Sequence, residues 1–192
     1  MQILYRLIAG YLAKRPALVE RLIERARRTP YNHIKSRDGK REYMRRYWLF
    51  NPYDQVTRER KHWWIPVSIR IHEIMLPDDD EHLHDHPFDA QTIILRGWYI
   101  EERDEEVAGA FCGETVIGPG WIRVMEAGDT APVLFGDFHR IAAKSREPVV
   151  SMFITFKERG MWGFDVDGVK VPWAEYLAQR EAAHDESFSL KA

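Results

Sequence analysis

The sequence predicts a mainly β fold, a barrel or sandwich of short strands with helices near both ends of the chain. Apolar and polar residues alternate in short runs after Trp64, and glycines and prolines separate these runs. Near both ends, apolar residues instead recur at three- and four-residue spacing, which is typical of amphipathic helices. Many short strands separated by turn residues indicate a sandwich or barrel. A length of 192 residues fits one domain with a helical arm.

Residues 1–62 are expected to form a basic helical and aromatic arm that packs on the barrel. The apolar spacing predicts one helix over residues 3–12 and a second that begins near Pro16 and ends at residues 29–30. Residues 42–53 are rich in Tyr, Trp and Phe. We expect this segment to be a strand or helix that packs on the barrel, with stacking on nucleic-acid bases as the alternative.

Residues 63–172 are expected to form the barrel itself. The strands that the alternation indicates cover residues 67–72, 92–100, 121–125, 132–135 and 148–156. Gly97 interrupts the second of these strands, and residues 136–137 form a tight turn. A further strand is expected between Gly113 and Gly118. Pro172 is well placed to open a helix, so residues 173–192 are expected to form a C-terminal helix and tail.

The composition excludes several classes of protein. The single cysteine, Cys112, cannot form an internal disulfide, so we expect a reducing, cytoplasmic location. No uncharged stretch approaches the roughly 20 apolar residues of a membrane-spanning helix. Residues 1–14 lack the charged segment and the cleavage site of a signal peptide. No nucleophile-elbow motif or glycine-rich phosphate loop is present, so the sequence gives no support to serine hydrolase or kinase chemistry.

The net charge of −2 hides an uneven distribution of charge along the chain. Residues 1–61 hold 16 of the 28 Lys and Arg but 6 of the 30 Asp and Glu, a balance of +10. Such asymmetry can indicate an anionic partner such as nucleic acid. Because the arginines are spread along helical segments rather than massed in one tract, we expect the basic arm to dock on the acidic barrel. Nucleic-acid binding is the less favoured alternative.

Three of the eight histidines lie within residues 82–86, as His82, His84 and His86. In an extended segment, residues two apart point to the same side, so His84 and His86 can bind one metal ion together. The alternative is a solvated acidic loop, since residues 78–80 are all aspartate. His139 follows a glycine turn between two short strands and offers a third imidazole.

These histidines resemble the first metal-binding motif of the cupin superfamily. His84 and His86 match its two histidines. Gln91 stands at the position of its glutamate, and Gly97 falls close to its final glycine. The opening glycine of the motif is replaced by Asp78.

The second cupin motif is also similar to part of this sequence. Gly128, Gly136 and His139 have its spacing, while Leu134 replaces its proline and Ala143 its asparagine. The resemblance covers about residues 63–160 and implies a cupin-type double-stranded β-helix (jelly-roll) barrel. The chain also resembles a group of bacterial and phage cupin-like proteins, through residues 84–88, 94–99, 138–141 and 162–164. That closer resemblance implies the fold and not a reaction.

The resemblance implies a site for a divalent transition metal. Its ligands would be His84, His86 and His139, with Gln91 as a weak fourth. Iron(II) is favoured, and zinc, nickel and manganese are the alternatives. A three-histidine iron site resembles those of thiol dioxygenases and ring-cleaving cupin dioxygenases, which implies an oxygenase acting on a small molecule. The same set on zinc would suit a hydrolytic water.

Two other functions stay open. One is a non-catalytic cupin that binds a small ligand or partner, and the other is a nucleic-acid-associated protein that uses the basic arm. The resemblance also implies a homodimer, because cupins are often dimers.

Strand parity extends the predicted site. Gln91, Ile93 and Leu95 point to one side of their strand, so Ile93 and Leu95 would form apolar cavity wall if Gln91 faces the metal. Tyr99 and Glu101 continue this parity and could offer a phenol or a carboxylate at the cavity edge. An ordinary barrel position is the alternative for both.

Four further residues lie near the predicted ligands in the sequence. His82 is a loop residue or a fourth ligand. Asp85 alternates away from the histidines and is expected to face solvent. Asp89 could orient a ligand histidine. Arg140 could bind an anionic substrate, as could Arg123, with an exposed surface role as the alternative for both.

Overall fold

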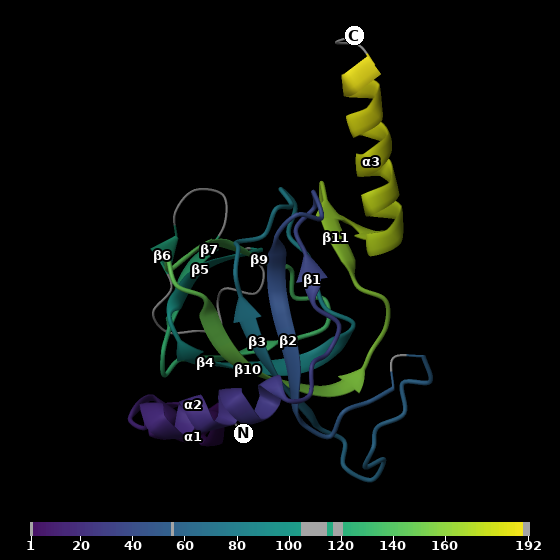
Figure 1. The fold of residues 1–192 in the computed structure, drawn as a ribbon. Helices are drawn as coiled ribbons and strands as arrows, with labels where there is room; N and C mark the ends of the chain where they lie inside the picture. The colour runs from purple at the N-terminus through teal and green to yellow at the C-terminus, as the bar shows by residue number, and fades with distance from the viewer. Residues whose placement is uncertain (1, 55, 105–114, 117–120, 190–192) are drawn as a thin grey trace.

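A computed structural model describes residues 2–54, 56–104, 115–116 and 121–189. The predicted fold class is confirmed: antiparallel strands form the body, with two helices at the N-terminus and one at the C-terminus (Figure 1). Cys112 lies outside the described residues. No helix among the described residues combines the length and apolar character needed to cross a membrane.

The strands form two sheets and a hairpin. The larger sheet has the order β1 (Ile34–Lys35), β2 (Glu42–Phe50), β3 (Ser68–Ile74), β10 (Val149–Glu158), β4 (Phe88–Arg96) and β8 (Thr130–Val133). The smaller sheet has the order β6 (Thr115–Val116), β7 (Trp121–Glu126), β5 (Trp98–Arg103) and β9 (His139–Lys144). A separate hairpin of β11 (Gly163–Val166) and β12 (Val169–Pro172) leads into α3 (Trp173–Ser189).

The chain alternates between the two sheets along its length. β3 belongs to the larger sheet, and the next segment bridges β9 of the smaller sheet at His84. β4 returns to the larger sheet, β5 and β7 to the smaller, β8 to the larger, β9 to the smaller and β10 to the larger. This alternation is the connectivity of the predicted cupin-type barrel. As a result, segments far apart in the sequence meet at one end of the barrel.

Gly97 makes the crossover from β4 to β5. Its φ of 79° is in the left-handed region that glycine adopts at little cost. A Cβ atom at this position would lie 2.8 Å from Ser145 Oγ and 3.3 Å from Val149 Cα. The predicted interruption at Gly97 is therefore the point where the chain changes sheet.

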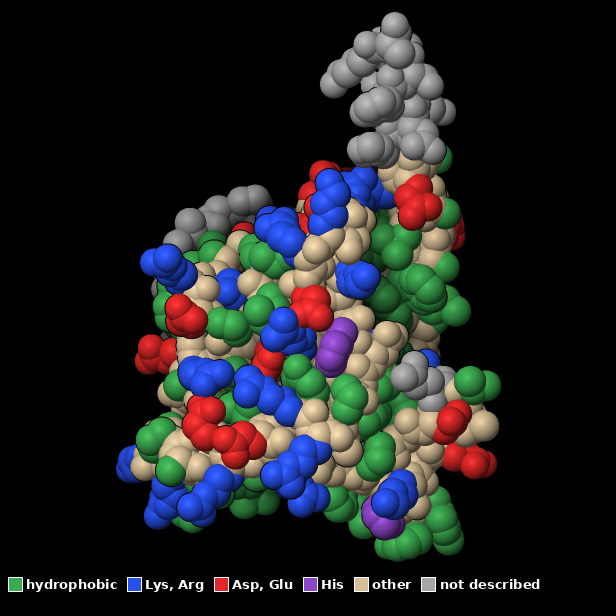
Figure 2. Space-filling model, in the orientation of Figure 1, with side chains coloured by type: hydrophobic (Ala, Val, Ile, Leu, Met, Phe, Trp, Pro, Cys, Tyr) green, Lys and Arg blue, Asp and Glu red, His purple; other side chains and the backbone are tan. Residues whose placement is uncertain are grey.

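The helices α1 (Gln2–Ala13) and α2 (Pro16–Arg27) cover the outer face of the larger sheet (Figure 1). The core between helices and sheet includes Ala9, Leu12, Val19, Ile23, Ile71, Ile93, Leu95 and Met152. Ion pairs join Arg27 to Glu73 at 2.5 Å and Glu20 to Arg96 at 2.7 Å. Other Lys and Arg side chains gather on the surface near the helices (Figure 2). The basic helices thus dock on the body of the molecule.

The rest of the expected arm belongs to the barrel. β2 is hydrogen-bonded to β3 along its length, with Tyr47 opposite Ile71. The boundary expected at residue 62 therefore does not separate an arm from a barrel. Of the expected arm, α1 and α2 lie outside the sheet, whereas β1 and β2 are strands of it.

Candidate metal centre

Three histidines converge at one end of the barrel. His84 and His86 precede β4, and His139 begins β9. The backbone N–H groups of His84 and His139 each donate to the other residue's carbonyl at 2.9 Å. One ring nitrogen of each of the three histidines lies within 4.8 Å of the others. The structure therefore brings the three predicted histidine ligands together.

The spacing of the imidazole nitrogens suits a metal ion. His86 Nε2 and His139 Nε2 are 2.9 Å apart. Two nitrogens that each lie about 2.1 Å from one ion, at a right angle, are about 3 Å apart. Three imidazoles form a donor set that suits iron, zinc, copper or nickel. The residues present therefore fit a divalent transition metal.

Glu101 orients one of the three rings. Its Oε1 lies 2.5 Å from His139 Nδ1, so the imidazole donates its Nδ1 proton to the carboxylate and presents the Nε2 lone pair to the cluster. Arg103 and Arg123 hold Glu101 at 3.2 and 3.0 Å. Burial alone would raise the pKa of Glu101, but Arg103, the hydrogen bond from His139 and Arg123 hold it well below its usual value. The carboxylate therefore stays ionised.

The other two histidines are held in the form that binds metals. Burial lowers the pKa of His84, and burial together with His139 lowers the pKa of His86 well below its usual value. Both imidazoles are thus neutral near neutral pH, and a neutral imidazole is the form that coordinates a metal.

Aromatic side chains cover the His84 side of the cluster. The His84 ring lies 6.2 Å from Trp162 and 5.9 Å from Phe164. Phe164 stacks on Tyr176 of α3 at 3.9 Å, and Trp162 stacks on Trp173 at 5.7 Å. The β11–β12 hairpin and α3 therefore form a wall beside the candidate ligands.

Asp85 fixes the segment that carries two of the histidines. It accepts hydrogen bonds from the Gly136 N–H at 3.2 Å, the Gly163 N–H at 2.8 Å and Lys170 Nζ at 2.5 Å. The expectation that Asp85 faces solvent was wrong, because this carboxylate is fully buried. A buried charge is stable here because three donors satisfy it.

Gln91 lies away from the three histidines. Its amide donates to Thr130 Oγ1 at 2.7 Å and is hydrogen-bonded to Gln2 of α1. Ile93 and Leu95 share this face and pack against the helices. Gln91, Ile93 and Leu95 thus share one face of β4 as predicted, but that face lies against the helices, so Ile93 and Leu95 do not line a cavity beside the histidines. The structure does not bring Gln91 to the predicted ligands.

The opposite face of β4 points into the barrel. Ala90 packs with Phe88, Val133 and Phe153, and Ile94 packs with the core of the smaller sheet. Ala90, the inner-face residue next to Gln91, offers no ligand atom. Among the described residues, the candidate ligands are therefore the three imidazoles.

His82 and Arg140 support neighbouring segments instead of the cluster. His82 Nδ1 lies 2.9 Å from the Tyr176 hydroxyl. Arg140 Nε donates to Glu102 at 2.5 Å, and its Nη1 donates to the Glu81 carbonyl at 2.7 Å. Neither side chain is bonded to one of the three histidines.

Asp89 and Tyr99 are also bonded elsewhere. Asp89 accepts from the Phe135 N–H and from Arg159, both at 3.1 Å, so it does not orient a histidine. Tyr99 is buried in the core of the smaller sheet. Of the five residues expected around the ligands, Glu101 is the one bonded to the cluster within the part of the chain that the structure describes.

The residues that hold Glu101 were not identified from the sequence. Arg103 lies two positions from Glu101 on the same face of β5, and Arg123 stands opposite Glu101 in the neighbouring strand β7. The two-residue spacing could have indicated Arg103, since residues two apart in a strand share a face. The pairing with Arg123 depends on strand register.

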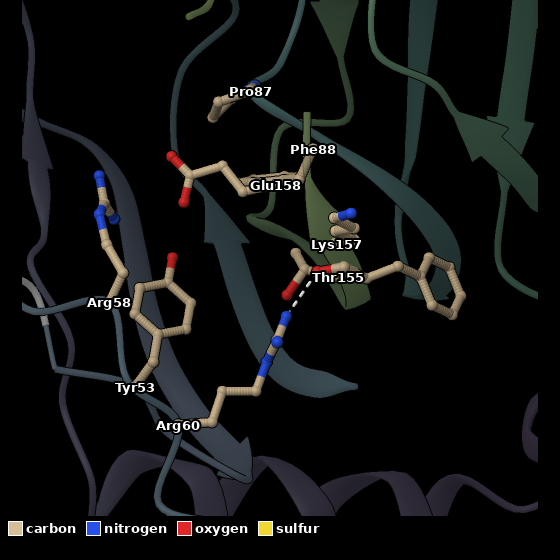
Figure 3. Close-up of a pocket in the computed structure, with 9 residues that line it drawn as sticks. Tyr53, Arg58, Arg60, Pro87, Phe88, Thr155, Lys157 and Glu158 are labelled. Atoms are coloured by element: carbon tan, nitrogen blue, oxygen red, sulfur yellow. Dashed lines mark hydrogen bonds between the residues drawn. The ribbon is translucent and has the colours of Figure 1, made fainter. Parts of the chain in front are cut away.

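A pocket lies next to the segment that carries His86. Its volume is about 290 Å³, and its lining residues are Tyr53, Arg58, Arg60, Pro87, Phe88, Thr155, Phe156, Lys157 and Glu158 (Figure 3). Pro87 and Phe88 directly follow His86 in the chain. The His86 ring also stacks near Phe88, with ring centres 5.9 Å apart. Phe88 therefore belongs both to the lining of the pocket and to the surroundings of His86.

Comparison with known proteins gives similarity of fold. No protein-family model matches the chain, and no curated protein sequence matches it. A cupin-2 domain protein from Rhodospirillum rubrum is 13% identical, with a TM-score of 0.45 over 78% of this chain and 80% of that one. A variant of Bacillus subtilis oxalate decarboxylase is 16% identical, with a TM-score of 0.45 over 77% of this chain and 31% of that one.

An iron(II) form of HppE is 12% identical, with a TM-score of 0.43 over 65% of this chain and 55% of that one. The chain thus spans about a third of the oxalate decarboxylase and about half of HppE. At these levels of similarity the activities and metals of those proteins do not transfer to this chain. Its own strand order gives a cupin-like barrel that brings three histidines together.

Proposed function

We propose that the protein binds one divalent transition metal through His84, His86 and His139 and acts on a small molecule as a non-haem iron oxygenase. The observation that carries the proposal is the convergence of three imidazoles, one of them oriented by a buried glutamate. Imidazole donors suit iron, zinc and nickel alike, and iron(II) is the metal we propose, with zinc, nickel and manganese as alternatives.

A metal bound here would supply Lewis-acid and redox chemistry at the positions that the histidines leave open. The chain's own residues perform the supporting roles. Glu101 keeps the proton on His139 Nδ1, and the pair Arg103 and Arg123 keeps Glu101 ionised. Phe88 and Trp162 lie beside the imidazoles and limit the access of water.

A second candidate function is a structural metal site in a non-catalytic binding protein. It is favoured by the burial of Asp85, which joins the ligand segment to the turn before β9 and to the β11–β12 hairpin. A metal at the three histidines would reinforce the same junction. The two candidates differ in whether the metal keeps an open coordination position.

Metal content tests the shared part of both candidates. We expect about one equivalent of metal per chain in the wild-type protein and its loss in His86→Ala and His139→Ala. His82→Ala is the matched control, because His82 contacts Tyr176 and not the cluster. At a metal concentration 100 times Kd, binding should stabilise the fold by about 2.7 kcal/mol. A wild-type protein without metal, and without a metal-dependent rise in Tm, would refute the proposal.

Nitric oxide distinguishes the oxygenase from the structural site. Added to the iron(II) protein under anaerobic conditions, it should give a stoichiometric iron–nitrosyl electron paramagnetic resonance signal if a coordination position is open. An iron-loaded protein that gives no such signal would support the structural metal site instead.

A further inference from the structure

A row of basic side chains lies on the inner face of the larger sheet. Arg70 and His72 are two residues apart on β3 and share this face. In the neighbouring strands, Arg70 stands opposite Trp48 of β2 and opposite Phe153 of β10. His72 stands opposite Arg46 of β2. These groups are therefore placed by strand register and not by a flexible loop.

Arg70 is buried without a counterion. Its exposed fraction is 3%, and its side chain is hydrogen-bonded to Tyr31, but its Nε has no hydrogen-bond partner among the described residues. No described Asp or Glu forms an ion pair with it. Instead, the rings of Tyr31, Trp48, Phe88 and Phe153 lie 5.4 or 5.5 Å from its Cζ. Aromatic faces attract a cation but do not neutralise its charge.

The other buried arginines of the barrel are paired. Arg103 and Arg123 both contact Glu101. Arg46 is only partly buried, and its Nε donates to the Asn32 carbonyl at 2.7 Å. Arg103 Nε and Nη1 also have no hydrogen-bond partner among the described residues, so what distinguishes Arg70 is that no carboxylate lies beside it.

His72 adds a second unpartnered group beside Arg70. It is 7% exposed, and its Nε2 has no hydrogen-bond partner among the described residues. Its ring stacks on Phe153, with centres 4.8 Å apart and an interplanar angle of 26°. Burial lowers its pKa well below the usual value, and Arg70 and Arg46 lower it further, so the ring is neutral and one nitrogen carries a proton. Two adjacent buried side chains therefore have nitrogen atoms without a partner.

The same two phenyl rings contact both this pair and the metal centre. Phe88 and Phe153 each lie 5.9 Å from the His86 ring. They also lie 5.4 and 5.5 Å from Arg70 Cζ. A small molecule that bridged these rings would have one end near Arg70 and the other near the histidines.

The pocket beside His86 shares a lining residue with the surroundings of Arg70. Phe88 lines the pocket and also contacts Arg70. Tyr53 lines the pocket as well, and its ring packs on Trp48 at 4.8 Å. Figure 3 shows Arg58 and Lys157 among the lining residues, with Glu158 as the one acidic group. Net positive charge at an entrance raises the local concentration of anions.

We infer that Arg70 and His72 form a subsite for the carboxylate group of a small organic acid, which rests on the proposed function because the rest of that molecule would reach the histidines. A guanidinium is planar and matches a carboxylate with two parallel hydrogen bonds. A single buried positive charge matches a monoanion. The aromatic rings around Arg70 suit a flat or short carbon skeleton.

Acetate and benzoate are suitable probes, with benzamide as the uncharged match of benzoate. Titration calorimetry on metal-free protein should show that at least one of the two carboxylates binds. Benzamide should bind at least about tenfold more weakly than benzoate. Arg70→Met should weaken carboxylate binding at least about tenfold. Arg96→Met is the matched control, since Arg96 pairs with Glu20 on the surface. Failure of both carboxylates to bind the wild type, or equal binding by Arg70→Met, would overturn the subsite.

Metal content separates this inference from the proposed function. Arg70→Met should retain the wild-type metal content, because Arg70 contacts no ligand nitrogen. Lost carboxylate binding with normal metal content supports the subsite. Carboxylate binding by a chain that takes up no metal would refute the metal centre alone. If Arg70→Met does not fold, His72→Phe and the comparison of benzoate with benzamide on the wild type decide the question in its place.

Discussion

The two faces of the larger sheet are both covered, but they are built differently. On the outer face, Ile71 and Ile93 pack under α1 and α2, and the polar side chains Glu73 and Gln91 are paired with Arg27 and with Thr130. On the inner face, nitrogen atoms of Arg70 and His72 have no partner among the described residues. A buried polar group without a partner costs about 1–3 kcal/mol. The outer face therefore stabilises the fold, and the inner face keeps groups that stability does not require.

The largest effect is expected on the smaller sheet, where the buried charges are paired, in contrast to Arg70 on the inner face of the larger sheet. Glu101→Gln would leave the buried Arg103 and Arg123 without their carboxylate, and we expect the free energy of unfolding to fall by about 3–5 kcal/mol. Metal affinity should fall about 10–100-fold, because His139 loses the charge that orients it. Urea unfolding and metal titration measure these effects.

Glu102→Gln is the control for this substitution. Glu102 is the next residue, is partly exposed and pairs with Arg140, so its loss should cost less than about 1 kcal/mol. Equal stability of Glu101→Gln and the wild type would show that the paired charges of the smaller sheet are not needed for stability.

Loss of side-chain volume on the outer face of the larger sheet should lower the free energy of unfolding. Ile93 of β4 is fully buried between the larger sheet and the helices. Ile93→Ala should lower the free energy of unfolding by about 2–5 kcal/mol. Ile93→Val should cost about 0.5–1.5 kcal/mol. Metal content should stay at the wild-type value in both variants. A folded Ile93→Ala protein that contains no metal would show that the outer face also supports the metal centre, contrary to this prediction.

Replacement of the unpaired Arg70 on the inner face of the larger sheet should change the free energy of unfolding in the opposite direction. Arg70→Met removes a buried charge and leaves a side chain of similar length among aromatic rings. We expect the free energy of unfolding of the ligand-free protein to rise by about 1–2 kcal/mol. Chemical denaturation of the metal-free protein measures it. A fall of similar size would mean that the guanidinium stabilises the fold, and the contrast between the faces would disappear.

The pH dependence of stability gives the finest comparison. The pKa values of His72, His84 and His86 are all lower in the folded protein than in the unfolded chain, mainly because of burial. As pH falls below about 6.5, the unfolded chain binds protons that the folded chain does not, so stability falls. Each histidine contributes a slope of up to about 1.4 kcal/mol per pH unit.

His72→Phe should therefore flatten the acid side of the stability curve by up to about 1.4 kcal/mol per pH unit in the metal-free protein. His82→Phe, at a residue that contacts α3, serves as the comparison. An unchanged slope in His72→Phe would show that folding does not lower the pKa of His72.

Local patterns in the sequence predicted much of this molecule. Apolar spacing predicted both N-terminal helices, and the two-residue spacing of His84 and His86 predicted that they act together. The predictions failed where a contact depends on distant residues. Asp85 is buried by the Gly163 N–H and by Lys170, and nothing near Asp85 in the sequence indicates these donors.

The remaining errors concern the orientation of β4 and β3, because both faces of these strands are covered in the folded protein. Ile93, Ile94 and Leu95 are consecutive apolar residues, so their pattern does not say which face of β4 points inward. In β3, the alternation of Ile69 and Ile71 with Arg70 suggests a polar face toward solvent. The helices cover the apolar face instead, and the arginine points into the barrel. The inner basic row was missed for that reason.

The contacts of α3 give the candidate metal centre a mechanical connection to the exterior. The helix projects from the end of the barrel (Figure 1), and its Tyr176 stacks on Phe164, which in turn packs against His84. The backbone of Leu83 and Asp85 is hydrogen-bonded to the same hairpin. A change in the tilt of α3 would therefore reach the segment that carries His84 through the Tyr176–Phe164 stack and through the backbone hydrogen bonds of the hairpin. The position of the C-terminal helix is in this way coupled to the position of His84.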